Sequence, residues 1–314
     1  MKSLTILAII CGLATTQYHS EPKPGPTVAQ KPSEKGEEED VSRQIVLEEF
    51  TKARPAAGRT RPSTTSLSKA ARYRRKSPAV LVGLKASNAS VAKIGITLWR
   101  LRPSGLAEDG ARMLVIESGQ STQLTPVRVE ADEVLSLGER VRLSIESARP
   151  GYLYVVDRER YEDGTLGDPV LIFPTTRTRG GDNRVKPGVL VDIPAQEDST
   201  PYFTLKSNHP QYSGELLTVV IVSRSIQGLK IGPEPLVLPL AELVKWERNW
   251  NSQSELFEMV GGGGKPWTKA EQAAAVTSGA RMLTQEGPAP QTVYWVAWRG
   301  GQGFMVNVPL RCRR

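Results

Sequence analysis

Residues 137–159, LGERVRLSIESARPGYLYVVDRE, contain two successive strands of different character. In the first half, apolar and polar residues alternate with the period of two that is typical of a strand with one buried face. The apolar face comprises Val141, Leu143 and Ile145, and the polar face comprises Arg140, Arg142, Ser144 and Glu146. The second half begins at Pro150-Gly151 and is apolar on both faces, which predicts a central strand covered on both sides at residues 152–156.

Further short strands are expected on both sides of this stretch. They are KIGITLWRL (93–101), RMLVIES (112–118), PVLIFPT (169–175), GVLVDIP (188–194), YFTLKS (202–207) and ELLTVVIVSRS (215–225). Turns rich in Gly and Pro separate them, and no long helical pattern intervenes. This organisation predicts a mainly β fold, an antiparallel β-sandwich, over residues 79–232.

The pattern changes after Pro235, where Leu240, Leu243, Val244 and Trp246 have helical spacing that continues toward residues 256–257. Gly261–Gly264 are then expected to link this helix flexibly to a second one. The second helix begins with a capping box, Thr268 and Glu271, and is expected to reach about residue 283. The strands TVYWVAW (292–298) and FMVNVPL (304–310) flank RGGQG and predict a hairpin. Residues 233–314 are thus expected to form a small α+β appendage that packs on the sandwich. Because its hairpin is apolar on both faces, the hairpin is expected either to add to the main sheet or to pack under the helices, which would make this segment integral to the fold.

The N-terminus has the pattern of a secretory signal peptide, predicted over residues 1–20. Lys2 precedes a mostly apolar stretch, residues 4–13, that is too short to span a bilayer, which takes about 20 residues. A lipoprotein signal at Cys11 is disfavoured, because Ile10 stands where a small residue is needed. Removal of the signal leaves Cys312 as the last of two cysteines, so no disulfide within the chain is expected.

Residues 21–78 are rich in Pro, Ser, Thr and charges, and predict a disordered tether. Within it, residues 41–53 can form a helix that is marginal in isolation. The basic run RYRRK contributes a candidate basic patch, Arg72, Arg74, Arg75 and Lys76. Together with the net charge of +8, this run favours acidic partners such as an anionic polymer or membrane surface.

The charged segment after the central strand, DRERYEDGT (157–165), raises the question of a reaction site. Asp163-Gly164 is typical of a tight hairpin turn, so most of these charges are expected to be solvated at the tip of a loop. Aromatic residues near the C-terminus are mainly expected in the core. The candidate binding residues are Tyr152, Tyr154, Asp157, Glu159, Asp163 and Trp298.

The motifs GYLY (151–154) and IFP (172–174), with the strands around them, resemble a bacterial domain family of unknown function. Its signature is a strand that ends in Gly-Tyr-Leu-Tyr, followed by a Leu-Phe-Pro strand, where this chain has Ile172. The resemblance covers about half of the chain. It implies a β-sandwich and an accessory role in an exported protein, because the family also occurs appended to caspase-like peptidases and kinase-type modules. It carries no catalytic residues over to this sequence.

Several chemistries are disfavoured by the inventory of residues. His209 lies in a loop, SNHPQYSG, and is the only histidine in the body of the chain that can act as a general base. The GGGGK segment lacks the spacing of a phosphate-binding loop. The carboxylates of residues 157–168 lack the D-x-D-x-D-G spacing of a calcium loop, and zinc ligands are missing. No catalytic residue, metal site or cofactor is predicted.

These observations favour an exported, non-enzymatic protein that binds or scaffolds a component of the bacterial cell envelope, either a protein or a polymer. One alternative is an envelope hydrolase that uses carboxylates or His209. Another is an electrostatic binder of acidic polymers through the basic run. No specific nucleic-acid partner is expected, and no transmembrane helix after removal of the signal.

Overall fold

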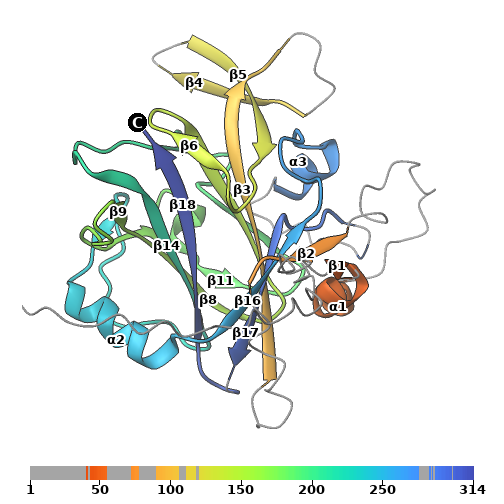
Figure 1. Ribbon diagram of the computed structural model, residues 1–314, viewed down its shortest axis with the longest axis vertical. Helices are drawn as coiled ribbons and strands as arrows, with labels where there is room; N and C mark the ends of the chain where they lie inside the picture. The colour runs from red at the N-terminus through yellow and green to blue at the C-terminus, as the bar shows by residue number, and fades with distance from the viewer. Residues whose placement is uncertain are drawn as a thin grey trace, which may run out of the picture. The chain divides into compact units, whose positions relative to one another are not determined.

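The protein is mainly β, and its strands form two sheets with an apolar core between them, as the sequence predicts (Figure 1). The computed structural model describes residues 40–41, 43–54, 72–77, 90–105, 111–117, 120–275, 283, 285, 287–298 and 300–314. These residues belong to one compact unit, Glu38–Arg314. The predicted signal peptide and most of the predicted tether lie outside the described residues.

The first sheet has ten strands and is organised by the long strand β3 (Ser90–Pro103). One edge of β3 pairs with β7 (Arg140–Ser147). The other edge pairs first with β17 (Thr292–Trp298) and then with β5 (Gln120–Arg128). The remaining strands are β1 (Asp40–Val41), β2 (Tyr73–Arg75), β4 (Met113–Glu117), β12 (Leu190–Ile193), β13 (Phe203–Thr204) and β16 (Ser254–Met259).

The second sheet has eight strands, and β14 (Tyr212–Val222) lies at its centre. β14 pairs antiparallel with β8 (Gly151–Asp157) on one side and with β18 (Phe304–Arg313) on the other. The remaining strands are β6 (Val134–Ser136), which runs parallel to β18, β9 (Glu159–Tyr161), β10 (Val170–Phe173), β11 (Arg184–Val185) and β15 (Leu236–Val237).

Strand β8 confirms the prediction of a central strand covered on both faces. Leu153 and Val155 point into the core between the sheets, whereas Tyr154 and Val156 belong to a separate cluster on the outer face. Helix α2 (Leu240–Trp250) covers this outer face through Leu243 and Trp246, both of which are buried. The Tyr154 and Trp246 rings meet edge to face at 5.7 Å. Both faces of β8 are therefore removed from water, which explains its unbroken apolar sequence.

The prediction that α2 continues toward residues 256–257 is wrong. The helix ends at Trp250, and residues 254–259 form β16, which pairs with β17 and with β2. In β16, Glu255 and Phe257 share a buried face, so the period of two applies here. Among the described residues, no helix has the length and apolar character needed to cross a membrane.

The predicted C-terminal hairpin is also wrong. β17 lies between β16 and β3 in the first sheet, whereas β18 lies between β14 and β6 in the second. The glycine-rich connection therefore carries the chain from one sheet to the other. Apolar residues on both faces of these strands reflect their central positions in two different sheets. Residues 292–313 are integral to both sheets.

Part of the segment predicted as a disordered tether is folded. Helix α1 (Arg43–Ala53) buries Val46, Leu47 and Phe50 against the first sheet. Further along, Tyr73 of β2 is fully buried in the same cluster, and its hydroxyl donates to the Pro290 carbonyl oxygen at 2.6 Å. A helix that is marginal alone thus gains its stability from tertiary packing.

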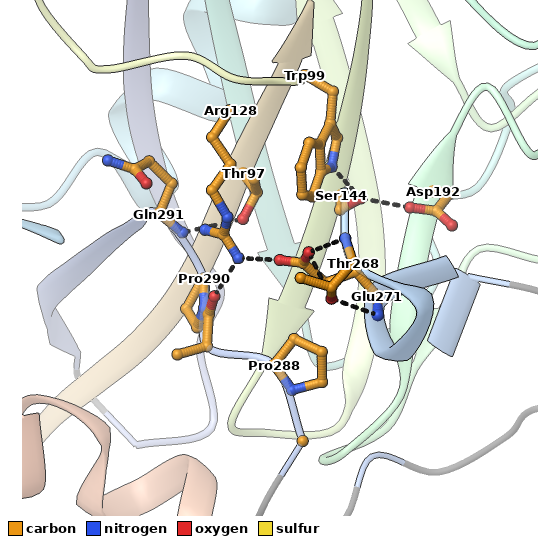
Figure 2. A network of polar contacts seen from close by, with 12 residues as sticks. Thr97, Trp99, Arg128, Ser144, Asp192, Thr268, Glu271, Pro288, Pro290 and Gln291 are labelled. Carbon is orange, nitrogen blue, oxygen red and sulfur yellow. Dashed lines mark hydrogen bonds and ion pairs between the residues drawn. The ribbon is translucent and has the colours of Figure 1, made fainter. Parts of the chain in front are cut away.

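The expected solvent face of β7 is buried, which corrects the prediction of a half-buried strand. Arg142, Ser144 and Glu146 are 1%, 3% and 1% exposed. Ser144 lies in a polar network next to helix α3 (Lys269–Ala275) (Figure 2), and Ser144 and Glu146 line a small space together with Glu271 of α3 and residues 288–290. The Arg142 guanidinium stacks on the Trp267 ring. The alternation of apolar and polar residues in β7 predicts its two faces correctly. The polar face, however, is covered by other parts of the protein, including the charged side chains of Arg54 and Asp192, and not by water.

Buried ion pairs neutralise the charges of this covered face. Arg54 donates from Nε to Glu146 Oε1 at 2.8 Å, and Arg142 lies 2.7 Å from Asp192. Arg128 pairs with Glu271, whose capping box with Thr268 is confirmed (Figure 2). Breaking one partner of such a pair is expected to cost several kcal/mol, because the other charge stays buried.

The glycine run that precedes α3 is packed, in contrast to the expected flexible link between two helices. It connects β16 to α3, and Gly264 donates to the Arg128 carbonyl oxygen at 2.9 Å. A Cβ on Gly262 would lie 2.1 Å from Gln291 Oε1, and one on Gly263 would lie 2.4 Å from the Glu130 side chain. The absence of side chains therefore allows close approach at this point.

Candidate functional site

A cavity of about 480 Å³ opens between the two sheets, where β13 of the first sheet faces β9, β10 and β14 of the second. Its floor is apolar and comes from both sheets: Leu98, Val141, Leu143, Val170, Ile172, Phe203, Leu205, Leu217 and Leu310. Four carboxyl side chains and one lysine also line it: Asp157, Glu159, Asp168, Glu215 and Lys206. An apolar cavity with a few convergent polar groups is the usual form of a small-molecule site.

Strand alternation places three of these carboxyl groups on one face. Asp157 follows Leu153 and Val155 with a period of two, and so lies on the side of β8 that faces the core. Glu159 stands directly opposite Glu215 in the pairing of β9 with β14. Side chains at opposite positions of an antiparallel pair lie on the same face and close together. The three carboxyl groups thus extend the core face of the second sheet to the cavity.

A bulge in β14 aims Glu215 and its neighbour Tyr212 inward together. The register shifts between Tyr212 and Gly214, where φ is 146°. A Cβ on Gly214 would lie 1.9 Å from the Leu310 carbonyl oxygen, so only glycine fits between β14 and β18. Such bulges redirect side chains next to sites. Here the bulge brings the Tyr212 hydroxyl to Glu215 Oε1, to which it donates at 2.7 Å.

Asp157 and Glu215 form a pair of neighbouring carboxyl groups whose titrations influence each other. Asp157 Oδ1 and Glu215 Oε2 are buried and receive no N–H or O–H from the described residues. Two buried carboxyl groups that lie close together disfavour each other's charged form, so one of them retains a proton. The pair is therefore a site where one proton is held in the lining of a cavity.

Burial dominates the titration of this pair. Burial raises the pKa of Asp157 to about 6, although its hydrogen bond with Glu215 acts in the opposite direction. Burial, together with the charge of Asp157, raises the pKa of Glu215 to about 8. Interacting groups lose their protons as a pair, so these values describe two steps of the pair. Near neutral pH the pair holds about one proton.

A thiol and a phenol lie behind the carboxyl pair. The Tyr212 hydroxyl is 3.4 Å from Cys312 Sγ, and burial raises the pKa of both groups. Both side chains are buried in the core between the sheets. Both groups keep their protons near pH 7, and the Tyr212 hydroxyl donates to Glu215. This donor fixes the orientation of the carboxyl group.

The structure separates the residues predicted for binding. Asp157 and Glu159 line the cavity, as described above. Tyr154 points to the opposite face of the sheet, where its hydroxyl accepts from the Ile226 amide at 2.9 Å. Tyr152 packs partly buried against the same outer cluster. The two tyrosines therefore lie away from the cavity, because even-numbered positions of β8 face α2 and odd-numbered positions face the core between the sheets, where Asp157 reaches the cavity.

The hairpin tip confirms the expectation of solvated charges for Asp163 but not for Asp157. Asp163 is exposed and accepts from the Thr165 amide and hydroxyl at 2.8 and 2.7 Å. His209 lies beside this hairpin, and its ring stacks on Tyr161 at 3.9 Å. Tyr161 lines the cavity and donates to Glu159 Oε2 at 3.0 Å. His209 therefore supports the rim from outside the cavity lining.

The remaining candidates lie away from the cavity. Trp298 is partly buried at the end of β17, where its indole donates to the Gln302 carbonyl oxygen at 2.7 Å and Arg149 stacks on its ring. The basic run lies in and next to β2, so it is part of a sheet and not of a free tether. Lys76 lies 2.9 Å from Asp132, and Arg75 lies 3.8 Å from Glu255. These acidic neighbours compensate part of the positive charge.

Sequence reasoning missed Glu215, Tyr212 and Lys206. Glu215 left a signal, because it precedes Leu217, Val219 and Ile221 at intervals of two, on the face that enters the core. A carboxyl group at a core position needs a partner, a raised pKa or a ligand. Tyr212 does not follow this alternation, because the bulge at Gly214 shifts the register of β14. The sequence pattern therefore does not indicate that Tyr212 points inward.

The described residues contain no group of three His, Cys, Asp or Glu side chains arranged to hold a metal ion. Comparisons of the chain with protein-family models, with curated proteins and with solved structures return no match.

Proposed function

We propose that this protein is a non-enzymatic binding protein that holds an organic cation in the cavity between its sheets. The single observation that carries this proposal is the proton-sharing pair, Asp157 and Glu215, at the inner end of an apolar cavity. Glu159 and Asp168 add two further carboxyl groups to the lining. The ligand chemistry that matches this lining is an ammonium group on an apolar body.

The physical basis is the desolvation of the pair. A buried carboxylate is costly without a positive partner, and the pair meets this cost by retaining a proton. An ammonium group supplies the missing charge and can donate to the carboxyl oxygens that receive no other hydrogen bond. Binding therefore displaces the shared proton. The apolar part of the ligand would cover the leucine and phenylalanine side chains of the floor, which adds about 25 cal/mol for each Å² removed from water.

Calorimetric titration with hexylammonium tests this proposal, with 1-hexanol as a neutral ligand of the same length. We expect hexylammonium to bind and 1-hexanol to bind at least about 10-fold more weakly, which corresponds to one charge-assisted contact. Affinity should rise between about pH 6 and pH 8.5, because the pair then loses its proton, while an alkylammonium stays charged up to about pH 10.

Matched variants localise the binding. Glu215→Gln and Asp157→Asn should each weaken hexylammonium binding by about 10-fold or more, since each removes one charge of the pair. Asp163→Asn makes the same chemical change at the exposed hairpin tip and should leave the affinity unchanged. Equal binding of 1-hexanol and hexylammonium, or equal effects of all three variants, would contradict the proposal.

A hydrolase is the second candidate, and the same pair favours it. Two carboxyl groups that share one proton near neutral pH can act as general acid and general base. In that case Asp157→Asn and Glu215→Gln would abolish hydrolysis of envelope polymers while the protein stays folded. His209→Ala would leave the rate almost unchanged, since His209 is not part of the lining. Absence of turnover in the wild-type protein would leave binding as the function of the pair.

The place of action is proposed from the sequence. The signal-like pattern of residues 1–20 supports export, and the resemblance of the GYLY and IFP strands to exported bacterial domains supports an accessory role in the cell envelope. An envelope protein or polymer remains the proposed partner. Electrostatic attachment through the basic run is less favoured, because β2 is incorporated in the first sheet and Lys76 and Arg75 have carboxylate neighbours.

A further inference from the structure

A second cavity, of about 340 Å³, adjoins the carboxyl-lined one. The two share four lining residues, Ile172, Phe203, Thr204 and Lys206. Phe203 and Thr204 form β13 at the margin of the first sheet, and Ile172 belongs to β10 of the second. A single ligand can therefore extend from one cavity into the other along β13.

The second cavity differs from the first in chemistry. Its lining is rich in hydroxyl groups and prolines: Thr175, Thr178, Ser199, Thr200, Tyr202, Pro194, Pro233 and Pro235. Its one carboxyl group, Asp198, is occupied, because it accepts from the Thr178 hydroxyl and from the Ala195 amide. Of its two cations, Arg177 pairs with Glu234. The other is Lys206.

Lys206 lies where the two cavities meet and has no interaction partner among the described residues. Its side chain is exposed, and within the described part of the chain it makes no hydrogen bond or ion pair. Three of the four carboxyl groups of the first cavity interact with each other or with tyrosines: Glu215 with Asp157 and Tyr212, and Glu159 with Tyr161. The fourth, Asp168, is exposed to solvent. The Lys206 ammonium group thus lies between the acidic side chains of the first cavity and the hydroxyl groups of the second.

We propose that the ligand of this site is a zwitterion, an elongated molecule with an ammonium group at one end and a carboxylate at the other. This inference rests on the proposed function, because the ammonium group occupies the Asp157–Glu215 cavity. The carboxylate lies at Lys206 and the hydroxyl groups beyond it. Phe203 and Ile172 contact the apolar chain between the two charges. ω-Amino acids and short peptides belong to this class.

The gain from the second charge is modest, because Lys206 is exposed to solvent. Ion pairs at exposed sites are weak, and a hydrogen-bonded ammonium–carboxylate contact improves on them. We expect the carboxylate to improve affinity by about 3- to 10-fold. The gain in affinity should appear at one length of the ligand's carbon chain, since the fold fixes the backbone positions of the acidic pair and of Lys206.

The test compares n-alkylammonium ions with ω-amino carboxylic acids of the same chain length, over about four to eight carbons, by calorimetric titration of the wild-type protein. The expected result is tighter binding of the ω-amino acid at one length. Weaker or equal binding of the ω-amino acid at every length, with alkylammonium binding intact, overturns this inference and leaves the proposed function standing. Failure of both series overturns both.

Three lysine variants complete the test. Lys206→Gln should remove the advantage of the ω-amino acid and slightly strengthen binding of the alkylammonium, because a repelling charge is lost. Lys269→Gln makes the same change at the exposed start of α3 and should alter neither ligand. A Lys206→Arg variant should recover most of the advantage. If Lys206→Gln weakens both ligands equally, Lys206 does not read the carboxylate and the inference is wrong.

Discussion

Glu215→Gln is the variant that tests the shared proton most directly. The amide has the shape of the carboxyl group, so its oxygen can still accept from the Tyr212 hydroxyl at 2.7 Å. Its NH₂ group can donate to Asp157, which supplies the hydrogen that the pair otherwise obtains from a proton. The packing of the cavity is preserved, and only the titration of the pair changes.

The direction of the effect follows from the raised pKa values. Unfolding returns Glu215 from a pKa of about 8 to about 4.5, and Asp157 from about 6 to about 3.8. From about pH 4 to pH 8 the folded protein holds more protons than the unfolded chain, so the free energy of unfolding falls as pH rises through this window. The stabilising contribution of the protonated pair is complete below pH 4 and lost above pH 8.

The magnitude is bounded by the pKa of Glu215. A change from 4.5 to about 8 corresponds to at most about 5 kcal/mol, at about 1.4 kcal/mol for each unit. The cavity is open to solvent at its mouth, and water entering it stabilises the ionised pair. We therefore expect wild-type protein to lose about 2 kcal/mol more than Glu215→Gln between pH 5 and pH 8.5.

Urea unfolding monitored by tryptophan fluorescence at about pH 5, 7 and 8.5 measures this difference. Glu162→Gln, at the exposed hairpin tip, is the control for the same chemical change and should follow the wild-type curve. Wild-type stability that rises with pH over this range, or a Glu215→Gln slope equal to that of wild type, would refute a shared proton at this pair.

Three further predictions concern stability. Gly214→Ala should lower the free energy of unfolding in urea by about 3 kcal/mol or more, because the added Cβ would lie 1.9 Å from the Leu310 carbonyl oxygen. A loss under about 1 kcal/mol would contradict the close packing of β14 on β18. Glu146→Ala should lower the free energy of unfolding by about 3–5 kcal/mol, because Arg54 stays buried without its partner. Replacing both residues by apolar ones should restore much of this loss. No recovery in the double variant would contradict the explanation. Trp246→Ala should cost about 3–5 kcal/mol and expose the outer face of the second sheet, seen as increased binding of a hydrophobic dye.

Periodicity predicted the faces of individual strands well, because alternation is a local property. It identified the two covered faces of the strand at residues 152–156 and the apolar face of β7. It could not show what lies opposite the polar face of β7, because Arg54 and Glu271 come from distant segments. Burial of that face depends on ion pairs formed across the fold, which no local pattern contains.

The candidate site was predictable in part for the same reason. Asp157 and Glu159 were identified from their position after the central strand. Glu215 lies more than fifty residues away and meets them only through the pairing of β9 with β14. Its position on the apolar face of a strand was a readable signal. The bulge at Gly214 and the neighbouring cavity depend on the approach of β18, which the sequence led us to expect in a hairpin with β17 instead.

The passage of the chain from β17 to β18 has a consequence for how the protein can be divided. β17 fills the gap between β16 and β3, and β18 fills the gap between β14 and β6. A fragment that ends at residue 232 would keep β3 and β14 but leave an edge of each without its partner, and unpaired strand edges promote aggregation. We therefore expect the two sheets to gain or lose their order together, because β17 and β18 place residues beyond 232 inside both sheets.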